Sequence, residues 1–322
     1  MKFNVDKSIF EKFPGVRLGV VVALGVDNKK PKAILDFLRQ EEKAAREKLS
    51  SLIISEHDFI APWREAYRNF GSKPNEFSSS VEALAKRVQK GKELPNINPL
   101  VNLYNGLSLK YLLPFGGEDL DKVKGDVRLA FSTGNETGKY IGSDEISSCY
   151  SGEVAYVDDL GFICRRWNWR EADRTKLTEE TTNVVLVAEA LPPVSDVYLK
   201  QATQELSSLL RENLGGKTSI FYLDKQNPTL EIDIVTGTKL AKSEIIQPQK
   251  KTVSKEKNNN LKTQKKLIAK VSESLKSYFG SAKIIYDQIK KELHDLGLPE
   301  SKILLEHPAV ESHGDYSSNI AL

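Results

Sequence analysis

The stretch Leu18-Gly19-Val20-Val21-Val22-Ala23-Leu24-Gly25-Val26 is the longest apolar run of the chain. A helix that crosses a bilayer needs roughly 20 apolar residues, about twice this length. A short apolar run rich in valine is typical of a buried β-strand, and the segment from Lys32 to Ile54 that follows places its apolar residues at helical spacing. We therefore predict a buried strand followed by an amphipathic helix, and no membrane-spanning segment.

Further helices and strands follow in separate groups. The residues Ser79-Ser80-Val81-Glu82 have the Ser-x-x-Glu form of a capping box, which predicts a helix at 81–90, and helices are also predicted at Pro99 to Leu112 and at Asp196 to Asn213. Glycine-rich turns separate the predicted strands, which lie at 127–131, 154–157, 162–164, 184–188 and 230–235. Because helices and strands are largely segregated along the chain, the pattern indicates an α+β fold.

The composition is that of a globular protein, with 39% hydrophobic and 28% charged residues over 322 positions. The net charge of +3 is too small to indicate nucleic-acid binding, and it is unevenly distributed. Residues 1–240 contain 33 Lys and Arg against 34 Asp and Glu, whereas residues 241–322 contain 14 Lys, no Arg and 10 acids. The excess of positive charge therefore lies in the C-terminal quarter.

The chain is expected to form two domains. Seven lysines, three consecutive asparagines and few apolar residues lie between Lys242 and Lys265, so no packed core can form there. Helical periodicity then returns at Leu267 to Phe279 and Lys283 to Leu296, before a predicted strand at 303–305 and the first turns of a helix at 316–322. The predicted organisation is a main domain at 1–240, a basic flexible linker at 241–265 and a small, partial α/β domain at 266–322.

Several classes of site and location are not expected. The N-terminal residues resemble neither a secretory signal nor a transit peptide, so the expected compartment is the cytoplasm. Cys149 and Cys164 lack C-x-x-C spacing, and the four histidines are scattered, so we expect two reduced, partly buried thiols, no metal site and no cofactor. The stretch Gly134 to Lys139 has three residues between its glycines where a phosphate loop has four. No Gly-x-Ser-x-Gly motif occurs, so any hydrolysis is expected to use water as the nucleophile.

Three clusters combine aromatic residues with polar donors, at 63–68, 96–108 and 165–170. In the second cluster Asn98, Asn102 and Asn105 fall on one helical face, where they could line a pocket; a solvated face, or an N-terminal cap at Asn98, is the alternative. In the third cluster, strand alternation places Trp167 and Trp169 on one face and Arg166, Asn168 and Arg170 on the other. The two indoles could form the wall of a ligand site or simply pack in the core.

The residues from Trp63 to Thr182 resemble, over most of their length, the freestanding B3/B4 family. The matching positions are Trp63-Arg64, Tyr67-Arg68, Phe70-Gly71, Lys73-Pro74, Ser80 to Leu84, Leu94-Pro95, Ile97-Asn98, Leu100 to Asn102, Tyr104-Asn105, Ser108, Gly116-Gly117 and Asp119-Leu120, and Arg165 to Arg170 also match. This family is similar to the tRNA-editing domain of the phenylalanyl-tRNA synthetase beta subunit. The resemblance implies an editing domain with a central pocket that hydrolyses the ester joining a wrong amino acid to the terminal adenosine of tRNA. One branch deacylates tRNA(Arg) carrying canavanine.

The last ten residues, His313 to Leu322, resemble a motif of the N-terminal tRNA-binding domain of arginyl-tRNA synthetase. The resemblance covers only the first half of that domain. The resemblance implies tRNA contacts at His313, Gly314, Asp315, Tyr316 and Asn319, although a tight turn at Gly314 leading into a helix would give the motif a purely structural role. A flexible linker between an editing domain and such a reader raises the effective concentration at the acceptor end. We therefore expect aminoacylated tRNA(Arg) as the partner, with arginyl-tRNA synthetase as a second candidate, and neither DNA nor a membrane.

The resemblance also implies a set of site residues. Lys73 is expected to contact tRNA, and Glu136 and Glu153 are candidates to activate a water that the tRNA ribose hydroxyl orients. The glycine turns at Gly116-Gly117 and Gly152 are expected to stabilise the oxyanion, and the histidine that the synthetase domain carries near this point is missing. The expected substrate-binding residues are Arg64, Asn98, Asn102, Asn105, Ser108, Gly116, Gly117, Asp158, Arg165, Trp167, Asn168 and Arg170.

An enzyme that removes canavanine from tRNA(Arg) must leave correctly attached arginine in place, and this requirement suggests a hypothesis about charge in the pocket. Burying a permanently charged guanidinium without a partner costs several kcal/mol, so a pocket with amides and few carboxylates would favour a less basic oxyguanidine. Asn98, Asn102, Asn105 and Asn168 would supply the amides, and Arg165 or Arg170 would repel arginine. The alternatives are a noncatalytic tRNA-binding module, the N-terminal piece of a fusion with arginyl-tRNA synthetase, and a deacylase of small molecules.

Overall fold

The computed structural model describes residues 1–29, 32–233, 303–306 and 317–320. The chain divides into two compact units, Met1–Ile245 and Ile246–Leu322. In the second unit β13 (Ile303–Glu306) pairs antiparallel with β14 (Ser317–Ile320). The strand expected at 303–305 is thus confirmed, whereas residues 317–320 pair as a strand in place of the expected helix. The predicted linker and the helices expected at 267–279 and 283–296 lie outside the described residues.

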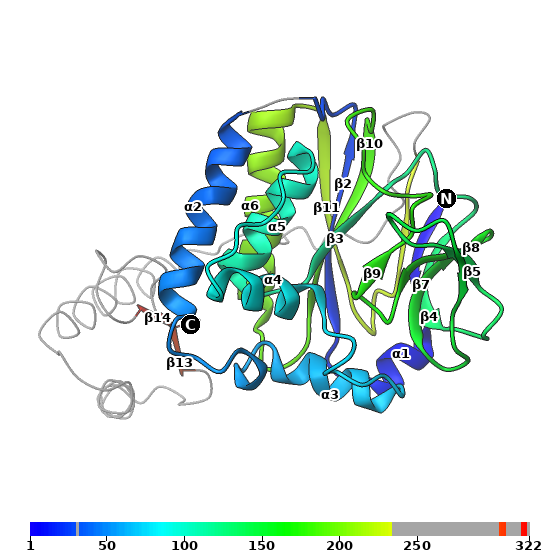
Figure 1. Ribbon diagram of the computed structural model, residues 1–322, viewed down its shortest axis with the longest axis horizontal. Coiled ribbons are helices and arrows are strands. Elements are labelled where there is room, and N and C mark those ends of the chain that lie inside the picture. Colours follow the sequence, from blue (N-terminus) through cyan, green and yellow to red (C-terminus); the bar gives the residue numbers. More distant parts are fainter. Residues whose placement is uncertain (30–31, 234–302, 307–316, 321–322) are drawn as a thin grey trace, which may run out of the picture. The chain divides into compact units, whose positions relative to one another are not determined.

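A four-stranded antiparallel sheet forms the centre of the first unit. Its strands run in the order β11 (Lys217–Leu223), β2 (Arg17–Leu24), β10 (Asn183–Ala190) and β3 (Phe115–Asp119). Two helices, α5 (Pro99–Tyr111) and α6 (Asp196–Leu214), cover one face of this sheet, and α2 (Lys32–Leu49) packs outside α5 (Figure 1). The helix α4 (Ser80–Gln89) contacts both α2 and α5.

A second sheet lies on the other side of the four-stranded sheet (Figure 1). Its six strands are ordered β12 (Thr229–Glu231), β1 (Lys2–Val5), β4 (Val127–Phe131), β7 (Val154–Asp158), β8 (Gly161–Arg165) and β9 (Arg170–Glu171), and only β1 and β4 run parallel. The remaining elements are α1 (Lys7–Lys12), the 3-10 helix Ile54–Glu56, α3 (Ala61–Asn69) and the paired strands β5 (Thr137–Lys139) and β6 (Ile146–Ser148).

The apolar strand β2 is buried on both faces. Val20 and Val22 pack into a core shared with Phe3 and other residues of the second sheet. Val21 and Ala23, which point the opposite way, pack into a second core with α5 and α6. A strand between two apolar layers needs no polar alternation, so the run quoted above has the uninterrupted pattern that predicts a buried strand, and this prediction is confirmed.

Most of the predicted elements are present, in a mixed helix and sheet structure that is consistent with α+β. The predicted capping box is wrong. Ser79 is the N-cap residue of α4, but its side chain makes no capping hydrogen bond. Glu82 is fully buried and accepts hydrogen bonds from Arg64 and Lys86, so its carboxylate does not reach back to the helix terminus.

The elements that were not predicted are the 3-10 helix Ile54–Glu56 and β1, α1, α3, β3, β5, β6, β9 and β11. Within the ranges that the structure describes, no helix combines the length and the apolar character needed to cross a membrane.

Gly19 allows β2 and α6 to approach each other closely. A Cβ atom at this position would collide with the hydroxyl of Thr203, which is buried and donates to the Leu199 carbonyl. We expect Gly19→Ala to lower the free energy of unfolding by about 1–3 kcal/mol, the usual cost of overpacking a core, as measured by urea denaturation. The cost should shrink when Thr203 is also replaced by alanine; an equal cost in both backgrounds would contradict the proposed collision.

Candidate functional site

A cavity of about 290 Å³ lies between the two sheets, near the lower end of the range of roughly 300–1,000 Å³ for ligand pockets. The edge strand β3 and strand β10 form one wall, and strands β1, β4, β7 and β8 form the opposite wall. The N-terminal part of α4, the middle of α5 and residues 167–171 complete the lining. The lining residues are Phe3, Ser80, Ala83, Leu84, Tyr104, Asn105, Phe115, Gly116, Gly117, Glu118, Val127, Ile141, Tyr156, Cys164, Trp167, Asn168, Trp169, Arg170, Glu171, Val185, Val187 and Glu189.

Three carboxyl groups face this otherwise largely apolar space. They belong to Glu118 on β3, Glu171 on β9 and Glu189 on β10. Sequence reasoning missed all three. One signal was available, because Glu189 interrupts the apolar strand at 183–190 that predicts burial, and a buried acid requires hydrogen-bonding partners or a ligand.

Glu189 is held by a network of hydrogen bonds. Its carboxylate accepts from the Tyr156 hydroxyl, from Trp167 Nε1 at 2.8 Å and from Asn168 Nδ2 at 2.6 Å. Asn168 Oδ1 in turn accepts from the Tyr67 hydroxyl of α3 at 2.9 Å. Burial raises the pKa of Glu189 to about 6, although its three donors act in the opposite direction. Glu189 is thus a fixed carboxylate that is largely ionised at neutral pH.

Glu118 and Glu171 influence each other's ionisation. Burial raises the pKa of Glu171 to about 7, while a backbone hydrogen bond from Gly117 opposes the rise. Burial also raises the pKa of Glu118 well above its usual value, and the nearby Glu171 carboxylate raises it further. At neutral pH this pair therefore retains at least one proton, with Glu171 poised to accept or release it.

Several polar groups of the cavity are available to a ligand. Glu118 Oε2 is buried and has no hydrogen-bond partner in the part of the chain described. The side chains of Asn105 and Arg170 likewise make no hydrogen bond or ion pair to any described residue. Burial keeps the pKa of Tyr104 well above its usual value, so its hydroxyl stays protonated and can donate. The cavity therefore offers acceptors and donors together.

Six of the expected substrate-binding residues line the cavity: Asn105, Gly116, Gly117, Trp167, Asn168 and Arg170. They come from α5, from β3, and from the segment 167–170 that leads from β8 into β9, which are distant in sequence. Cys164 lines it as well, and both cysteines are free and buried.

The other asparagines of α5 do not reach the cavity. Asn98 is the N-cap of α5, where its side-chain oxygen accepts from the Val101 amide, and its Nδ2 donates to the Leu177 carbonyl. Asn102 bridges Asn96 and the Ile97 amide. The Ser108 hydroxyl donates to the Leu113 carbonyl. The polar face of this helix therefore fixes its own ends, with Asn105 as the exception.

Three charged residues predicted for the site are used elsewhere. Arg165 donates to both carboxylate oxygens of the buried Glu153, at 2.8 and 2.7 Å, and although burial opposes it, this pairing lowers the pKa of Glu153. Asp158 accepts from Arg174 and from two backbone amides. Neither Glu153 nor Arg165 borders the cavity, so the structure corrects the prediction that Glu153 activates water there.

Glu136 is also engaged in local structure. Its carboxylate accepts from the hydroxyls of Ser132 and Thr133 and from the backbone amides of Thr133 and Gly134. Although burial opposes it, these hydrogen bonds lower the pKa of Glu136. The group stabilises the turn that follows β4 and is not a lining residue of the cavity.

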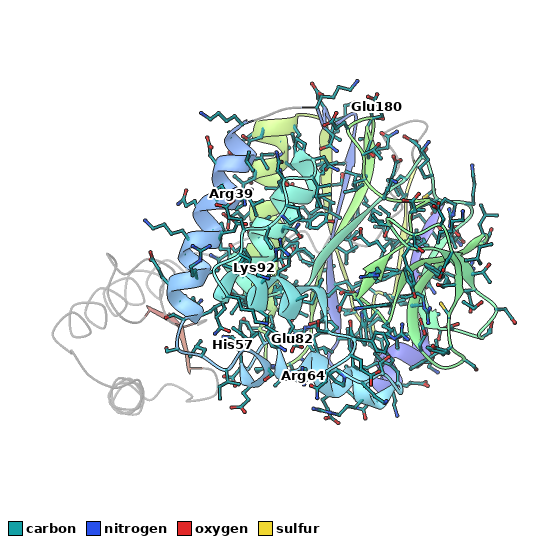
Figure 2. All side chains as sticks on the ribbon, viewed as in Figure 1. Arg39, His57, Arg64, Glu82, Lys92 and Glu180 are labelled. Atoms are coloured by element: carbon teal, nitrogen blue, oxygen red, sulfur yellow. The ribbon has the colours of Figure 1, made fainter. Side chains whose placement is uncertain are left out.

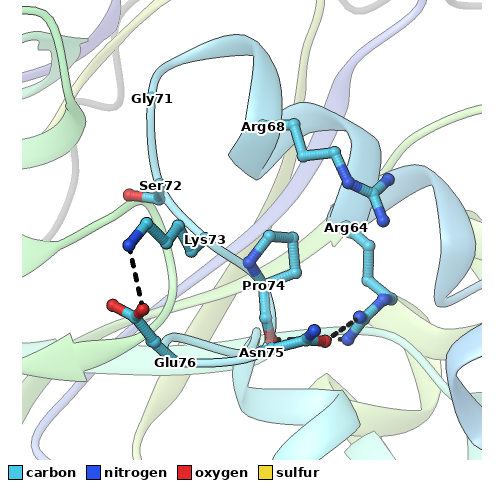
Figure 3. A pocket seen from close by; sticks show the side chains of 8 residues that line it. All are labelled: Arg64, Arg68, Gly71, Ser72, Lys73, Pro74, Asn75 and Glu76. Carbon is cyan, nitrogen blue, oxygen red and sulfur yellow. Dashed lines mark hydrogen bonds and ion pairs between the residues drawn. The ribbon is translucent and has the colours of Figure 1, made fainter.

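Arg64 and Lys73 lie in a separate surface depression of about 480 Å³ beside α3, together with Arg68 (Figure 3). Arg64 pairs with the buried Glu82 at 2.6 Å (Figure 2) and also donates to Asn75. Lys73 pairs with Glu76 at 3.1 Å. Much of the positive charge in this depression is therefore already neutralised by neighbouring acids.

The third cluster does not form the predicted strand. Arg166 and Trp167 have φ angles of 46° and 67°, in the left-handed region, so residues 166–169 turn the chain between β8 and β9. Trp167 is fully buried against Trp63 and Phe13, whereas Trp169 packs against Phe77 and Tyr140. The turn brings both indoles and the intervening Asn168 to the same cavity, so the predicted separation onto opposite faces is wrong.

The glycines are also used differently from the prediction. Gly116 and Gly117 lie inside β3, paired with Val187 and Leu186 of β10, and do not form a turn. A Cβ atom on Gly117 would meet Leu186, and one on Gly116 would approach the Glu171 carboxylate. Gly152 is in a turn with a φ of 85°, but its amide donates to the Ser132 carbonyl. The glycines of β3 thus provide space in the cavity. Neither the Gly116-Gly117 pair nor Gly152 forms a turn whose backbone amides are free to bind an oxyanion.

The hypothesis of few carboxylates is wrong, because three carboxyl groups and two asparagines line the cavity. Among the residues described here, no three histidine, cysteine or acidic side chains are grouped so that they could hold a metal ion. For the C-terminal motif, Asn319 lies in β14, and His313, Gly314, Asp315 and Tyr316 lie outside the described residues.

Comparison with protein families gives a match that covers this site. Residues 62–213 match the B3/4 domain. Every residue that lines the cavity except Phe3 falls within this range. The cavity therefore lies, apart from Phe3, within the part of the chain that matches the B3/4 domain.

Among solved structures, the chain is similar to an N-terminal fragment of the phenylalanyl-tRNA synthetase beta subunit from Pyrococcus horikoshii, with 12% sequence identity and a TM-score of 0.35. The match covers 69% of this chain and 54% of the fragment, so the chain spans about half the length of that relative. No curated protein matches the chain.

The raised pKa of Glu171 makes stability depend on pH. Above about pH 4.5 the unfolded chain releases this proton, whereas the folded protein retains it up to about pH 7. Since the native state binds more protons across this interval, the wild type loses stability as the pH rises through it. Glu171→Gln removes the titration, so we expect its free energy of unfolding to increase relative to wild type from about pH 4.5 to 7, as measured by urea denaturation.

The matched control for this measurement is Glu136→Gln. The pKa of Glu136 is lowered, so the stabilisation that its charge provides is present above pH 4.5 and is lost only at lower pH. The difference between this variant and the wild type should stay constant from about pH 5 to 7. A constant difference for Glu171→Gln as well would show that Glu171 is not buried in its protonated form.

Proposed function

We propose that this protein is an aminoacyl-tRNA deacylase, which hydrolyses the ester between an amino acid and the terminal ribose of tRNA. The observation that carries the proposal is the cavity of the B3/4 domain, with a poised carboxyl pair beside a fixed carboxylate. Strongly perturbed carboxyl groups that share a cleft are a common feature of acid–base sites. The similarity to a fragment of a tRNA synthetase, noted above, supplies the class of substrate to be tested.

In the proposed reaction the Glu171 carboxylate is the general base. It takes a proton from a water molecule as the water oxygen bonds to the carbonyl carbon of the ester. The tetrahedral intermediate then collapses, its bond to the ribose oxygen breaks, and the ribose oxygen takes the proton back from Glu171. A pKa of about 7 suits both transfers, since the group exchanges a proton readily in either direction at neutral pH.

The remaining polar groups are proposed to hold the amino acid. Glu118 Oε2, the Glu189 carboxylate and the Asn105 amide can accept hydrogen bonds from an acyl side chain rich in N–H donors. Canavanine and arginine both have such side chains. We propose canavanyl-tRNA(Arg) as the substrate on the resemblance described above, and the three carboxyl groups support a guanidine-type side chain over an apolar one.

The C-terminal unit is proposed to hold the tRNA through its arginyl-tRNA synthetase-like motif. Tethering would keep the acylated end near the cavity and raise its effective concentration. The proposed role of this unit is therefore in binding, separate from the chemistry assigned to the B3/4 domain. The proposed working compartment is the cytoplasm, where aminoacylated tRNA is used.

The test uses the full chain with canavanyl-, arginyl- and tyrosyl-tRNA. We expect release of canavanine, and we expect Glu171→Gln to slow it by about 10²–10⁴-fold, the usual contribution of a general base. Glu212→Gln, which makes the same change at an exposed position of α6, should retain the wild-type rate. The activity of the wild type should fall as the pH decreases below about 7, because Glu171 becomes protonated.

The other outcomes separate the alternatives. Binding of tRNA without release of any amino acid would support the noncatalytic module and reject the deacylase. Equal release of canavanine and arginine would place the discrimination outside this cavity, and release of tyrosine alone would reject the guanidine-type side chain.

A further inference from the structure

The side chain of Arg166 is buried without a hydrogen bond. The residue is only 3% exposed, and its Nε is enclosed without a partner in the described part of the chain. Neither of its other guanidinium nitrogens makes a hydrogen bond or ion pair to a described residue. The Glu153 carboxylate, which accepts from the Arg166 backbone amide, attracts this charge from nearby but makes no hydrogen bond to the guanidinium. A buried guanidinium whose N–H groups have no acceptor is costly, and a ligand with acceptor oxygens would satisfy them.

Aromatic rings surround this guanidinium. Its central carbon lies 3.7 Å from the centre of the Phe77 ring, 4.8 Å from that of Trp169 and 5.2 Å from that of Tyr150. Cation–π contacts recover part of the cost of burial, but they leave the N–H groups without acceptors. The rings therefore orient the group and do not neutralise it.

A second unpaired arginine lies against the same indole. The guanidinium carbon of Arg170 is 5.0 Å from the centre of the Trp169 ring, and Arg170 is exposed, lines the cavity and forms no ion pair with a described residue. Two like charges packed against one indole repel each other, and an anion bound by both guanidinium groups would offset this repulsion. The neighbouring Arg165 differs, because Glu153 neutralises it.

The backbone at this position is also strained. Arg166 has a φ of 46°, in the left-handed region that residues other than glycine adopt only at an energetic cost. The segment is fixed by Trp167, which is fully buried, and by the hydrogen bond from the Ser80 amide to the Asn168 carbonyl. The surrounding structure thus holds Arg166 in a conformation that an unconstrained turn would not adopt.

We propose that Arg166 and Arg170 form a phosphate-binding site at the opening of the cavity, and that it holds a phosphate of the acylated nucleotide end. The identity of the ligand rests on the proposed function. Arginine suits this task because its planar N–H groups match phosphate oxygens, and the adjacent Trp169 keeps both guanidinium groups oriented. A phosphate held at the opening would position the ester that follows it on the same nucleotide toward the carboxyl groups inside.

The first experiment measures binding to the full chain by tryptophan fluorescence, with 5′-AMP, adenosine and inorganic phosphate as probes. We expect 5′-AMP to bind at least tenfold more tightly than adenosine, since hydrogen bonds to charged groups typically contribute a factor of this size or more. Arg166→Gln and Arg170→Gln should each remove most of that difference. The control Arg211→Gln changes the same charge at an exposed position of α6 and should retain it.

Three results would overturn the site: equal affinities for 5′-AMP and adenosine, no binding of 5′-AMP, or an unchanged preference in Arg170→Gln. Arg170 is exposed, so its replacement keeps the test valid even if Arg166→Gln fails to fold. Inorganic phosphate that binds as tightly as 5′-AMP would assign the site to the free ion and reject the nucleotide.

The second experiment separates this site from the proposed function. An adenosine carrying an amino acid on its ribose, without a 5′-phosphate, is compared with its 5′-phosphorylated form. Arg170→Gln should lower kcat/KM about tenfold or more for the phosphorylated substrate and leave the other unchanged. Equal losses on both would reject the phosphate site while the deacylase stands. Absence of hydrolysis with a preserved preference for 5′-AMP would reject the deacylase while the site stands.

Discussion

The cost of placing carboxyl groups between two apolar sheet faces is the constraint on which the cavity depends. Burial removes these groups from bulk solvent, so Glu189 retains its charge only with the help of its three hydrogen-bond donors, while Glu118 and Glu171 share a proton. Such an arrangement contributes little to stability by itself. Its presence is better explained by a ligand whose own donors complete the hydrogen bonding of the cavity.

The packing around the cavity serves this arrangement. β2 and β10 are covered on both faces. β10 and the edge strand β3 form one wall of the cavity, and β3 has glycines where side chains would otherwise fill the space. The turn at 166–169 then closes the opposite side, with its indoles directed inward. The same turn carries Arg166 and leads directly to Arg170, which lines the cavity, so it connects the proposed phosphate site to the proposed site of hydrolysis.

The fold was largely predictable where local pattern and tertiary environment agree. The apolar run at 18–26 predicted a strand because both of its faces are buried, and helix 99–112 was predicted almost to the residue. The capping box failed because Glu82 has a stronger partner, Arg64, that lies distant in sequence. Strand alternation failed at Trp167 because packing holds its backbone in the left-handed region, which no local pattern indicates. The carboxyl groups were missed because they meet only when the sheets pack.

The hydrogen bonds of Asn168 run in one direction. Its oxygen accepts from Tyr67 and its nitrogen donates to Glu189. Rotating the amide by 180° would break both hydrogen bonds, so the side chain has a single orientation. An aspartate has nearly the same shape, yet it would set one acceptor against another at Glu189. Position 168 therefore requires both the size of asparagine and an N–H donor, and aspartate meets only the first requirement.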